Sequence, residues 1–145
     1  MKALIQKVSK ASVEINNKEY SSIKKGLLIF LGIKSTDTDI DIEYLTNKIL
    51  KLRIFPDKNK KMNYSIQDIA GEILVISQFT LYANCSKGNR PSFANAAKEK
   101  LANNLYLKFI NKLKSTNIRI KTGKFKENMN VKLVNKGPVT IILES

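Results

Sequence analysis

Two short polar segments hold the residues best suited to chemistry. The first is Ser77-Gln78-Phe79-Thr80, which follows an apolar run and places two hydroxyls and an amide where a buried strand would end. These groups could serve a reaction, or they could satisfy backbone groups as the chain turns. The second is Asn135-Lys-Gly-Pro-Val-Thr140, where Gly137-Pro138 would either interrupt a strand or form an ordinary hairpin turn.

The chain contains no histidine, which restricts the chemistry open to it. Ser-His-Asp and Cys-His arrangements and histidine-ligated zinc are therefore excluded. The single cysteine, Cys85, excludes an internal disulfide and a cysteine cluster for metal, and we expect it to be structural because no imidazole can activate its thiol. Any hydrolysis must use carboxylates, Lys, Tyr, hydroxyls, backbone groups or the substrate itself. We predict no metal and no cofactor.

The length of 145 residues predicts one domain spanning residues 1–145. With 43% hydrophobic and 26% charged residues, the composition is that of an ordinary globular protein without an apolar run long enough for a membrane span. The first ten residues include lysines and other polar residues among the apolar ones, so they lack the long apolar core of a secretory signal. We therefore expect a cytoplasmic protein with no membrane partner.

The formal charge of +14 predicts attraction to a polyanion. From residue 86 onward there are thirteen basic and three acidic residues, so this part carries +10 of the total. The abundance of Lys, Asn and Ile could equally reflect a biased genome. Within this part, Lys87 and Arg90 flank Gly88 in what is either a phosphate-contacting loop or a plain basic surface loop.

Hydrophobic periodicity predicts the elements that must position these residues. Strands are expected over residues 2–15, 19–23, 27–31, 72–79, 117–125, 129–134 and 139–143, with a turn at Asn16-Asn17. A first helix, capped by Ser35, Thr36 or Asp37, should bury Ile42, Leu45, Ile49 and Leu52. A second helix over residues 93–113 should bury Ala97, Leu101, Leu105, Phe109 and Leu113. The result is an α/β domain with seven or eight strands, mainly antiparallel, and two principal helices.

Taken together, Ser77-Gln-Phe-Thr-Leu81 and Asn135-Lys-Gly-Pro-Val-Thr140 resemble the two signature motifs of the D-aminoacyl-tRNA deacylases. Further similar stretches are Ala3–Val13, Gly26–Gly32, Leu52–Phe55, Lys61–Asn63, Lys87–Phe93, Thr122–Phe125 and Val139–Ser145. The resemblance implies a barrel-like sheet core, a homodimer, and hydrolysis of the ester that links a D-amino acid to the 3′-terminal ribose of tRNA. Glycine wrongly attached to tRNA is another implied substrate. DNA is not an expected partner.

The resemblance also implies roles for individual residues. The Gly137-Pro138 peptide would be cis and would reach into the partner subunit's pocket, where main-chain atoms reject L-amino acids. In one alternative the Thr80 hydroxyl is a nucleophile that forms an acyl-enzyme. In the other, the backbone N–H groups near Phe79 and Thr80 stabilise the oxyanion, while the 2′-hydroxyl of the tRNA assists attack by water. We favour the second, since no base in the motif would deprotonate Thr80.

Other implied roles are less specific. Gln78 would position polar atoms of the substrate with support from Ser77, and Phe125 and Met129 would either wall the pocket of the terminal adenosine or belong to the core. Lys7 replaces the arginine expected to anchor the Gly-Pro segment, so it keeps the charge but loses the planar fork. Two alternatives remain open: a related deacylase acting on L-alanyl-tRNA, if the Gly-Pro peptide were trans, and an RNA-binding module without catalysis.

Overall fold

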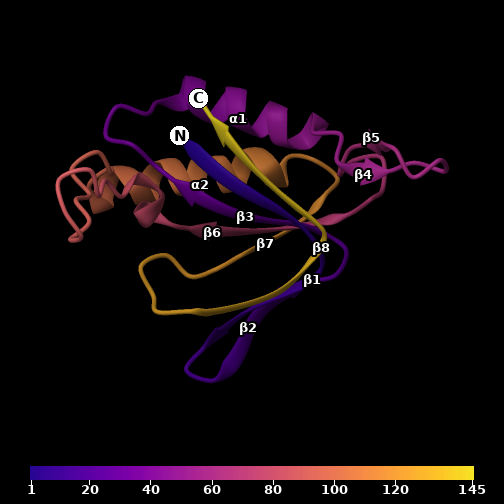
Figure 1. Cartoon of the computed structure of the whole chain (residues 1–145), viewed down its shortest axis with the longest axis horizontal. Helices are drawn as coiled ribbons and strands as arrows, with labels where there is room; N and C mark the ends of the chain where they lie inside the picture. Colours follow the sequence, from indigo (N-terminus) through magenta and orange to yellow (C-terminus); the bar gives the residue numbers. More distant parts are fainter.

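The longest early strand, β1 (Lys2–Ile15), is the strand around which the sheet is built in the computed structural model, which describes residues 1–145 (Figure 1). The other strands are β2 (Lys18–Ile23), β3 (Gly26–Gly32), β4 (Phe55–Pro56), β5 (Met62–Tyr64), β6 (Glu72–Ser77), β7 (Arg119–Thr122) and β8 (Asn130–Glu144). The helices are α1 (Asp39–Lys51) and α2 (Glu99–Lys114), and a short 3₁₀ turn, η1 (Phe79–Tyr82), follows β6.

The sheet is mixed and curls into a barrel-like shape. β1 pairs antiparallel with β3 along its first half and with β2 along its second half, while β8 covers its other edge along almost its whole length. β3, β6 and β7 then run parallel to one another. The Ser21 hydroxyl on β2 donates to the Thr122 carbonyl on β7 at 2.8 Å, which helps to close the barrel. The predicted fold class is confirmed, with a parallel portion in the sheet.

Both helices lie on one side of the sheet and pack against each other (Figure 1). The main core cluster fills the space between them and the strands, and a smaller one lies among β1, β2, β3 and β6. The expected apolar face of α1 is confirmed at Ile42, Leu45 and Ile49, which are buried, whereas Leu52 follows the helix end and is only partly buried. The cap prediction was wrong: Thr38 is the N-cap residue, and the Asp41 carboxylate in the first helical turn accepts a hydrogen bond from Thr38 N–H at 2.7 Å.

The second helix begins six residues later than predicted. Residues 93–98 lie beside the chain that leaves β3, because Ser35 N–H donates to Asn95 O at 3.1 Å and Ala97 N–H donates to Ile33 O at 2.9 Å. Local periodicity cannot reveal such long-range bonds. The buried face of α2 consists of Leu105, Tyr106, Phe109, Ile110 and Leu113, whereas Leu101 is exposed. Neither α-helix is long and apolar enough to cross a membrane.

Three strand predictions also need correction. The strand expected over residues 117–125 is confined to β7, Arg119–Thr122. The strand expected over residues 72–79 ends at Ser77, where the chain turns into η1. The two strands expected over residues 129–134 and 139–143 form the single strand β8, so Gly137-Pro138 does not end the strand. It lies instead in an irregularity of the pairing between β1 and β8.

Candidate active site

A cavity of about 470 Å³ lies beside the end of β6. It is bounded by the β6 exit, the first turn of α2 and the loop that joins β7 to β8. The structure places five of the predicted site residues around it: Ser77, Gln78, Phe79, Phe125 and Met129. Residues separated by about fifty positions in the sequence therefore share one concave space, which is the usual form of a small-ligand site.

The backbone at the exit of β6 is the most distinctive part of this cavity. Gln78 N–H still pairs with Leu31 O at 2.8 Å, and after it the chain winds into η1. Phe79 and Thr80 N–H make none of the hydrogen bonds found in turns and loops, and the first N–H groups of a 3₁₀ turn have no carbonyl partner within it. Two backbone donors are thus free at the β6 exit, and of the two residues Phe79 lines the cavity.

The side chains of Gln78 and Thr80 interact directly. Gln78 Nε2 donates to Thr80 Oγ1, so an amide donor occupies the threonine oxygen. An amide cannot take up a proton, and no carboxylate or amine is hydrogen-bonded to this hydroxyl. Thr80 is exposed and does not line the cavity. The geometry therefore supplies no base that would activate Thr80 as a nucleophile.

Aromatic and sulfur-containing side chains form the apolar walls. Phe79 is 55% exposed and meets Phe93 edge-to-face, with ring centroids 4.9 Å apart. Phe125 packs against Tyr106 at 5.9 Å, and Lys124 N–H donates to Met129 Sδ at 3.3 Å. Phe125 and Met129 thus line the cavity and also pack against the two core clusters. The two predicted alternatives for these residues, a pocket wall and a core position, are therefore compatible.

Two carboxylates of the cavity were missed by sequence reasoning. Glu99 pairs with Lys126 at 2.6 Å, and Glu127 pairs with Lys124 at 2.8 Å. The hydrogen bond with Glu127 raises the pKa of the Lys124 ammonium. The signal was present in the sequence, because Glu99 and Glu127 are two of only three acidic residues in the strongly basic part after residue 86. Both carboxylates are engaged by lysines.

Tyr106 supports the strand that leads into the site. Its hydroxyl is buried on α2 and donates to Val75 O at 3.0 Å. Burial raises the pKa of this phenol, so it remains a neutral donor. The bond fixes the position of the helix relative to β6, two residues before Ser77.

The Gly137-Pro138 pair forms a bulge on β8. Gln6 of β1 faces Thr140 and Val8 faces Asn135, so the four residues 136–139 oppose Lys7 alone. The Gly137-Pro138 peptide bond is cis, and Gly137 has a φ of +136°. Lys136, Gly137 and Pro138 are all exposed. The bulge is therefore open to solvent.

The Asn135 side chain spans the base of this bulge. Its Oδ1 accepts a hydrogen bond from Val139 N–H at 3.0 Å, and its Nδ2 donates to Thr140 Oγ1 at 2.8 Å. Gln6 Nε2 also donates to Thr140 Oγ1, at 3.3 Å. Sequence reasoning did not assign roles to Asn135 and Thr140, although both belong to the second signature motif. Their hydrogen-bonding side chains on either side of Gly-Pro were the available signal.

Lys7 lies next to the bulge but does not hydrogen-bond to it. Its Nζ donates to Ile54 O at 3.3 Å, and a Cβ atom on Gly137 would lie 3.6 Å from this Nζ. The expected anchoring of the bulge is thus made by Asn135. Lys87 and Arg90 are exposed in the loop closed by the backbone pairing of Asn84 with Ser92, and neither lines the cavity.

The structure does not bring the two signature segments together within one chain. The bulge faces Lys7, which pairs with Leu27, and Leu27 pairs in turn with Ile73 at the start of β6. Ser77 ends that strand, about 13 Å further along at the usual rise per residue, and two strands separate β6 from β8. Neither Gly137 nor Pro138 lines the cavity at the β6 exit.

Comparisons with known proteins identify the family. The family model described as D-Tyr-tRNA(Tyr) deacylase matches residues 4–144. The curated D-aminoacyl-tRNA deacylases of Clostridioides difficile (strain 630) and Aquifex aeolicus (strain VF5) are 50% and 53% identical to the chain, over all of it and over 97% and 98% of their own lengths.

Two solved structures share the fold. One, named "c-Myc DNA Unwinding Element Binding Protein", has a TM-score of 0.94 and 43% identity, covering 100% of this chain and 99% of the other. The second, described as a probable eukaryotic D-amino acid tRNA deacylase, has a TM-score of 0.85 with 16% identity and covers 98% of this chain and 97% of that one. From the family model and the full-length relatives, we conclude that the chain belongs to the D-Tyr-tRNA(Tyr) deacylase family of hydrolases.

Proposed function

We propose that the protein hydrolyses the ester of D-aminoacyl-tRNA and releases free tRNA and the D-amino acid. The observation that carries this proposal is the pair of free backbone N–H groups at Phe79 and Thr80, beside a cavity of about 470 Å³ in a chain of this family. Hydrolysis of an ester develops negative charge on the carbonyl oxygen, and fixed N–H donors stabilise such a charge. The chain needs no histidine for this step.

In the proposed mechanism the attacking group is water. Its oxygen adds to the carbonyl carbon while Phe79 and Thr80 N–H bind the oxyanion. The bond from that carbon to the 3′-oxygen of the ribose then breaks, and the proton released by water reaches the 3′-oxygen by way of the neighbouring 2′-hydroxyl. Gln78 positions the polar atoms of the substrate with support from Ser77, and its amide keeps the Thr80 oxygen occupied as an acceptor.

Selection of the D-enantiomer is assigned to the bulge of a second copy of the chain. The D and L forms differ in where the side chain points, so a main-chain wall at the position of the L side chain excludes it by collision. Gly137 and Pro138 suit this task, because they are exposed, and because Asn135 holds the base of the bulge. They lie away from the cavity of their own chain, so the wall must come from the partner in a homodimer.

A wall of this kind has two consequences for substrate range. Glycine has no side chain to collide with it, so glycyl-tRNA would also be hydrolysed. The identity of a D side chain that points away from the wall would matter little, which predicts activity towards several D-amino acids. The alternative of L-alanyl-tRNA is tied to a trans Gly137-Pro138 peptide, whereas this peptide is cis.

The tRNA itself would be held by further parts of the chain. Phe125 and Met129 suit the apolar face of the terminal adenosine, and Lys87, Arg90 and Lys7 offer charge to the phosphate backbone. The total charge of +14 supports binding of a polyanion. The proposed place of action is the cytoplasm, where charged tRNA is used.

The second candidate is a nucleic-acid-binding module without catalysis. The charge favours it, and one structural relative bears the name of a DNA-binding protein. Incubation of the protein with D-tyrosyl-tRNA, with free D-tyrosine measured over time, separates the two. The proposal predicts loss of the ester well above its spontaneous rate. Tight binding of tRNA or DNA with ester loss equal to that in buffer would favour the module and refute the deacylase.

A further inference from the structure

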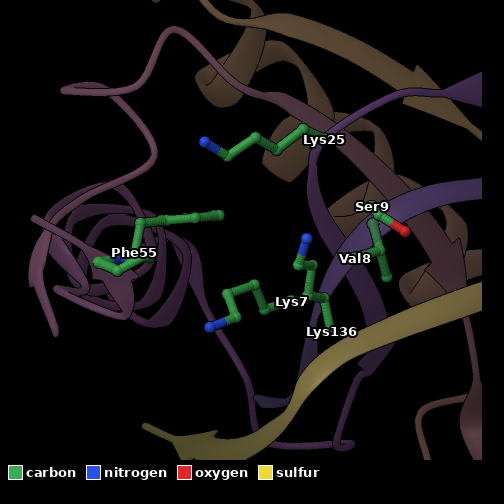
Figure 2. Close-up of a pocket in the computed structure, with 7 residues that line it drawn as sticks. Lys7, Val8, Ser9, Lys25, Phe55 and Lys136 are labelled. Carbon is green, nitrogen blue, oxygen red and sulfur yellow. The ribbon is translucent and has the colours of Figure 1, made fainter. Parts of the chain in front are cut away.

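A second cavity, of about 250 Å³, lies beside the bulge and takes no part in the proposed chemistry (Figure 2). Its lining comes from four separate segments: β1, the turn before β3, β4 and β8. The lining residues are Lys7, Val8, Ser9, Lys25, Phe55, Pro56 and Lys136. Val8 and Phe55 are each only 1% exposed, so part of the wall is fixed by the core. The result is a shaped recess lined by three lysines.

These lysines lack the carboxylates that pair with six other lysines of the chain. None of Lys7, Lys25 and Lys136 takes part in an ion pair, and no acidic residue lines the cavity. By contrast, Lys108 and Lys112 on α2 pair with Asp39 and Glu43 of α1. Three neighbouring cations without a counter-charge favour an anionic ligand.

The side chains are directed in a way that suits such a ligand. Figure 2 shows Lys25, from the turn before β3, and Lys136, from β8, reaching into the same space, with Phe55 on its far side. Lys7 extends towards the segment before Phe55, where its Nζ donates to Ile54 O at 3.3 Å. Lys25 and Lys136 are exposed and make no side-chain hydrogen bond that would hold them elsewhere. Their ammonium groups are therefore free to bind.

We propose that Lys25 and Lys136 bind a backbone phosphate of the tRNA 3′ strand, with Lys7 adding to the local charge. This inference rests on the proposed function and concerns how the same substrate is held. Lys136 directly precedes Gly137, so a ligand in this cavity lies next to the bulge that meets the aminoacyl ester. The nearest phosphate of the tRNA is one ribose away from that ester, within reach of a long lysine side chain. An isolated phosphate ion is the less favoured ligand, because a cavity open to solvent beside a bulge suits a continuous chain.

The test compares two esters in the wild type and in the double variant Lys25→Gln/Lys136→Gln. D-tyrosyl-tRNA carries the phosphates, whereas 3′-O-D-tyrosyl-adenosine does not. The ratio of kcat/KM for the tRNA ester to that for the adenosine ester should fall roughly 5- to 10-fold in the variant, through KM. The slope of log affinity for uncharged tRNA against log salt concentration should decrease by about 0.7, since one single-strand phosphate contact contributes about that much.

The matched control removes the same charge elsewhere. Lys18→Gln/Lys114→Gln alters two exposed lysines that line neither cavity and belong to no ion pair. It should leave the ratio of the two esters near the wild-type value. An equal loss in both double variants would overturn the proposal, because it would show an effect of net charge alone. The proposal would also be overturned if the Lys25→Gln/Lys136→Gln variant kept the wild-type ratio of kcat/KM for the two esters and the wild-type salt slope.

Failure of the pocket and failure of the proposed function can be told apart. A wild type that hydrolyses neither ester refutes the deacylase, while binding of uncharged tRNA still tests the two lysines through the salt slope. If the wild type hydrolyses both esters and the lysine double variant has the same ester ratio and salt slope, only the phosphate site is refuted. If inorganic phosphate shifts the NMR signals of Lys25 and Lys136 while the wild type and the variant bind tRNA equally, the cavity belongs to a free ion and the proposal is overturned.

Discussion

Asn135 Oδ1 accepts a hydrogen bond from Val139 N–H at 3.0 Å, and this contact spans the base of the bulge that carries Gly137 and Pro138. Asn135→Ala should loosen the bulge and lower stability by about 1–2 kcal/mol, since the hydrogen bonds with Val139 N–H and Thr140 Oγ1 are both lost. It should also reduce the preference for D-tyrosyl-tRNA over L-tyrosyl-tRNA. Asn135→Asp keeps the acceptor for Val139 and should retain more of that preference. Equal selectivity in the wild type and Asn135→Ala would contradict this role.

Gly137 and Gly88 form a matched pair for testing the shape of the bulge. Their φ angles are +136° and +137°, so an alanine at either position is strained by about 1 kcal/mol. A Cβ atom on Gly137 would lie 2.8 Å from Val139 Cγ2, whereas one on Gly88 would meet nothing within 4 Å. Thermal unfolding should show a loss of stability in both variants. Only Gly137→Ala should also slow deacylation, and similar activity in the two would argue against the bulge.

The proposed role of the backbone at Phe79 and Thr80 predicts a mild effect of Thr80→Ala. The backbone N–H groups remain, and only the hydroxyl that accepts from Gln78 is lost. Single-turnover hydrolysis of D-tyrosyl-tRNA should fall by no more than about tenfold, since no covalent step passes through Thr80. Loss of activity to the rate in buffer, together with a trapped acyl-enzyme in the wild type, would instead establish a threonine nucleophile.

Asp57 should give stability a defined acid dependence. Hydrogen bonds from the Asn63 side chain and then from the Lys61 backbone N–H lower the pKa of its carboxyl below the ordinary 3.8. Because the folded value is the lower one, the contribution is complete above pH 3.8 and is lost as the pH falls through the folded pKa. Asp57→Asn should therefore be less stable than the wild type near neutral pH, and the difference should shrink in acid. A difference in denaturation midpoint that persists unchanged at low pH would contradict this.

Much of the fold could be predicted because it depends on local patterns. The Asn16-Asn17 turn is confirmed, with φ angles of 51° and 62° at the two residues, and the alternating β1 is confirmed as a strand. Residues 93–98 could not be assigned correctly, because their partners at residues 33–35 lie about sixty positions away. The continuity of β8 could not be predicted either, since it depends on pairing with β1 on both sides of the bulge.

The candidate site was predicted in part. The polar exit of β6 was predicted from the first motif and the walls at Phe125 and Met129 from the family resemblance, and these residues lie around one cavity. The hydrogen bond of Asn135 across the base of the bulge was not predicted, because the sequence does not show which backbone group its side-chain amide faces. The positive charge beside the β8 bulge comes in part from Lys25 and Lys136. It could not be predicted, because only the fold brings these two distant residues to one cavity.

The central claim, that this chain cuts the ester and that handedness is read by main-chain atoms, is tested most directly by parallel deacylation. D-tyrosyl-tRNA, glycyl-tRNA and L-tyrosyl-tRNA are incubated with equal amounts of the purified protein, and free amino acid is measured against a buffer control. The account predicts hydrolysis of the D-tyrosyl and glycyl esters and an L-tyrosyl ester that decays only at its spontaneous rate. Equal hydrolysis of the D and L esters, or hydrolysis of neither, would contradict it.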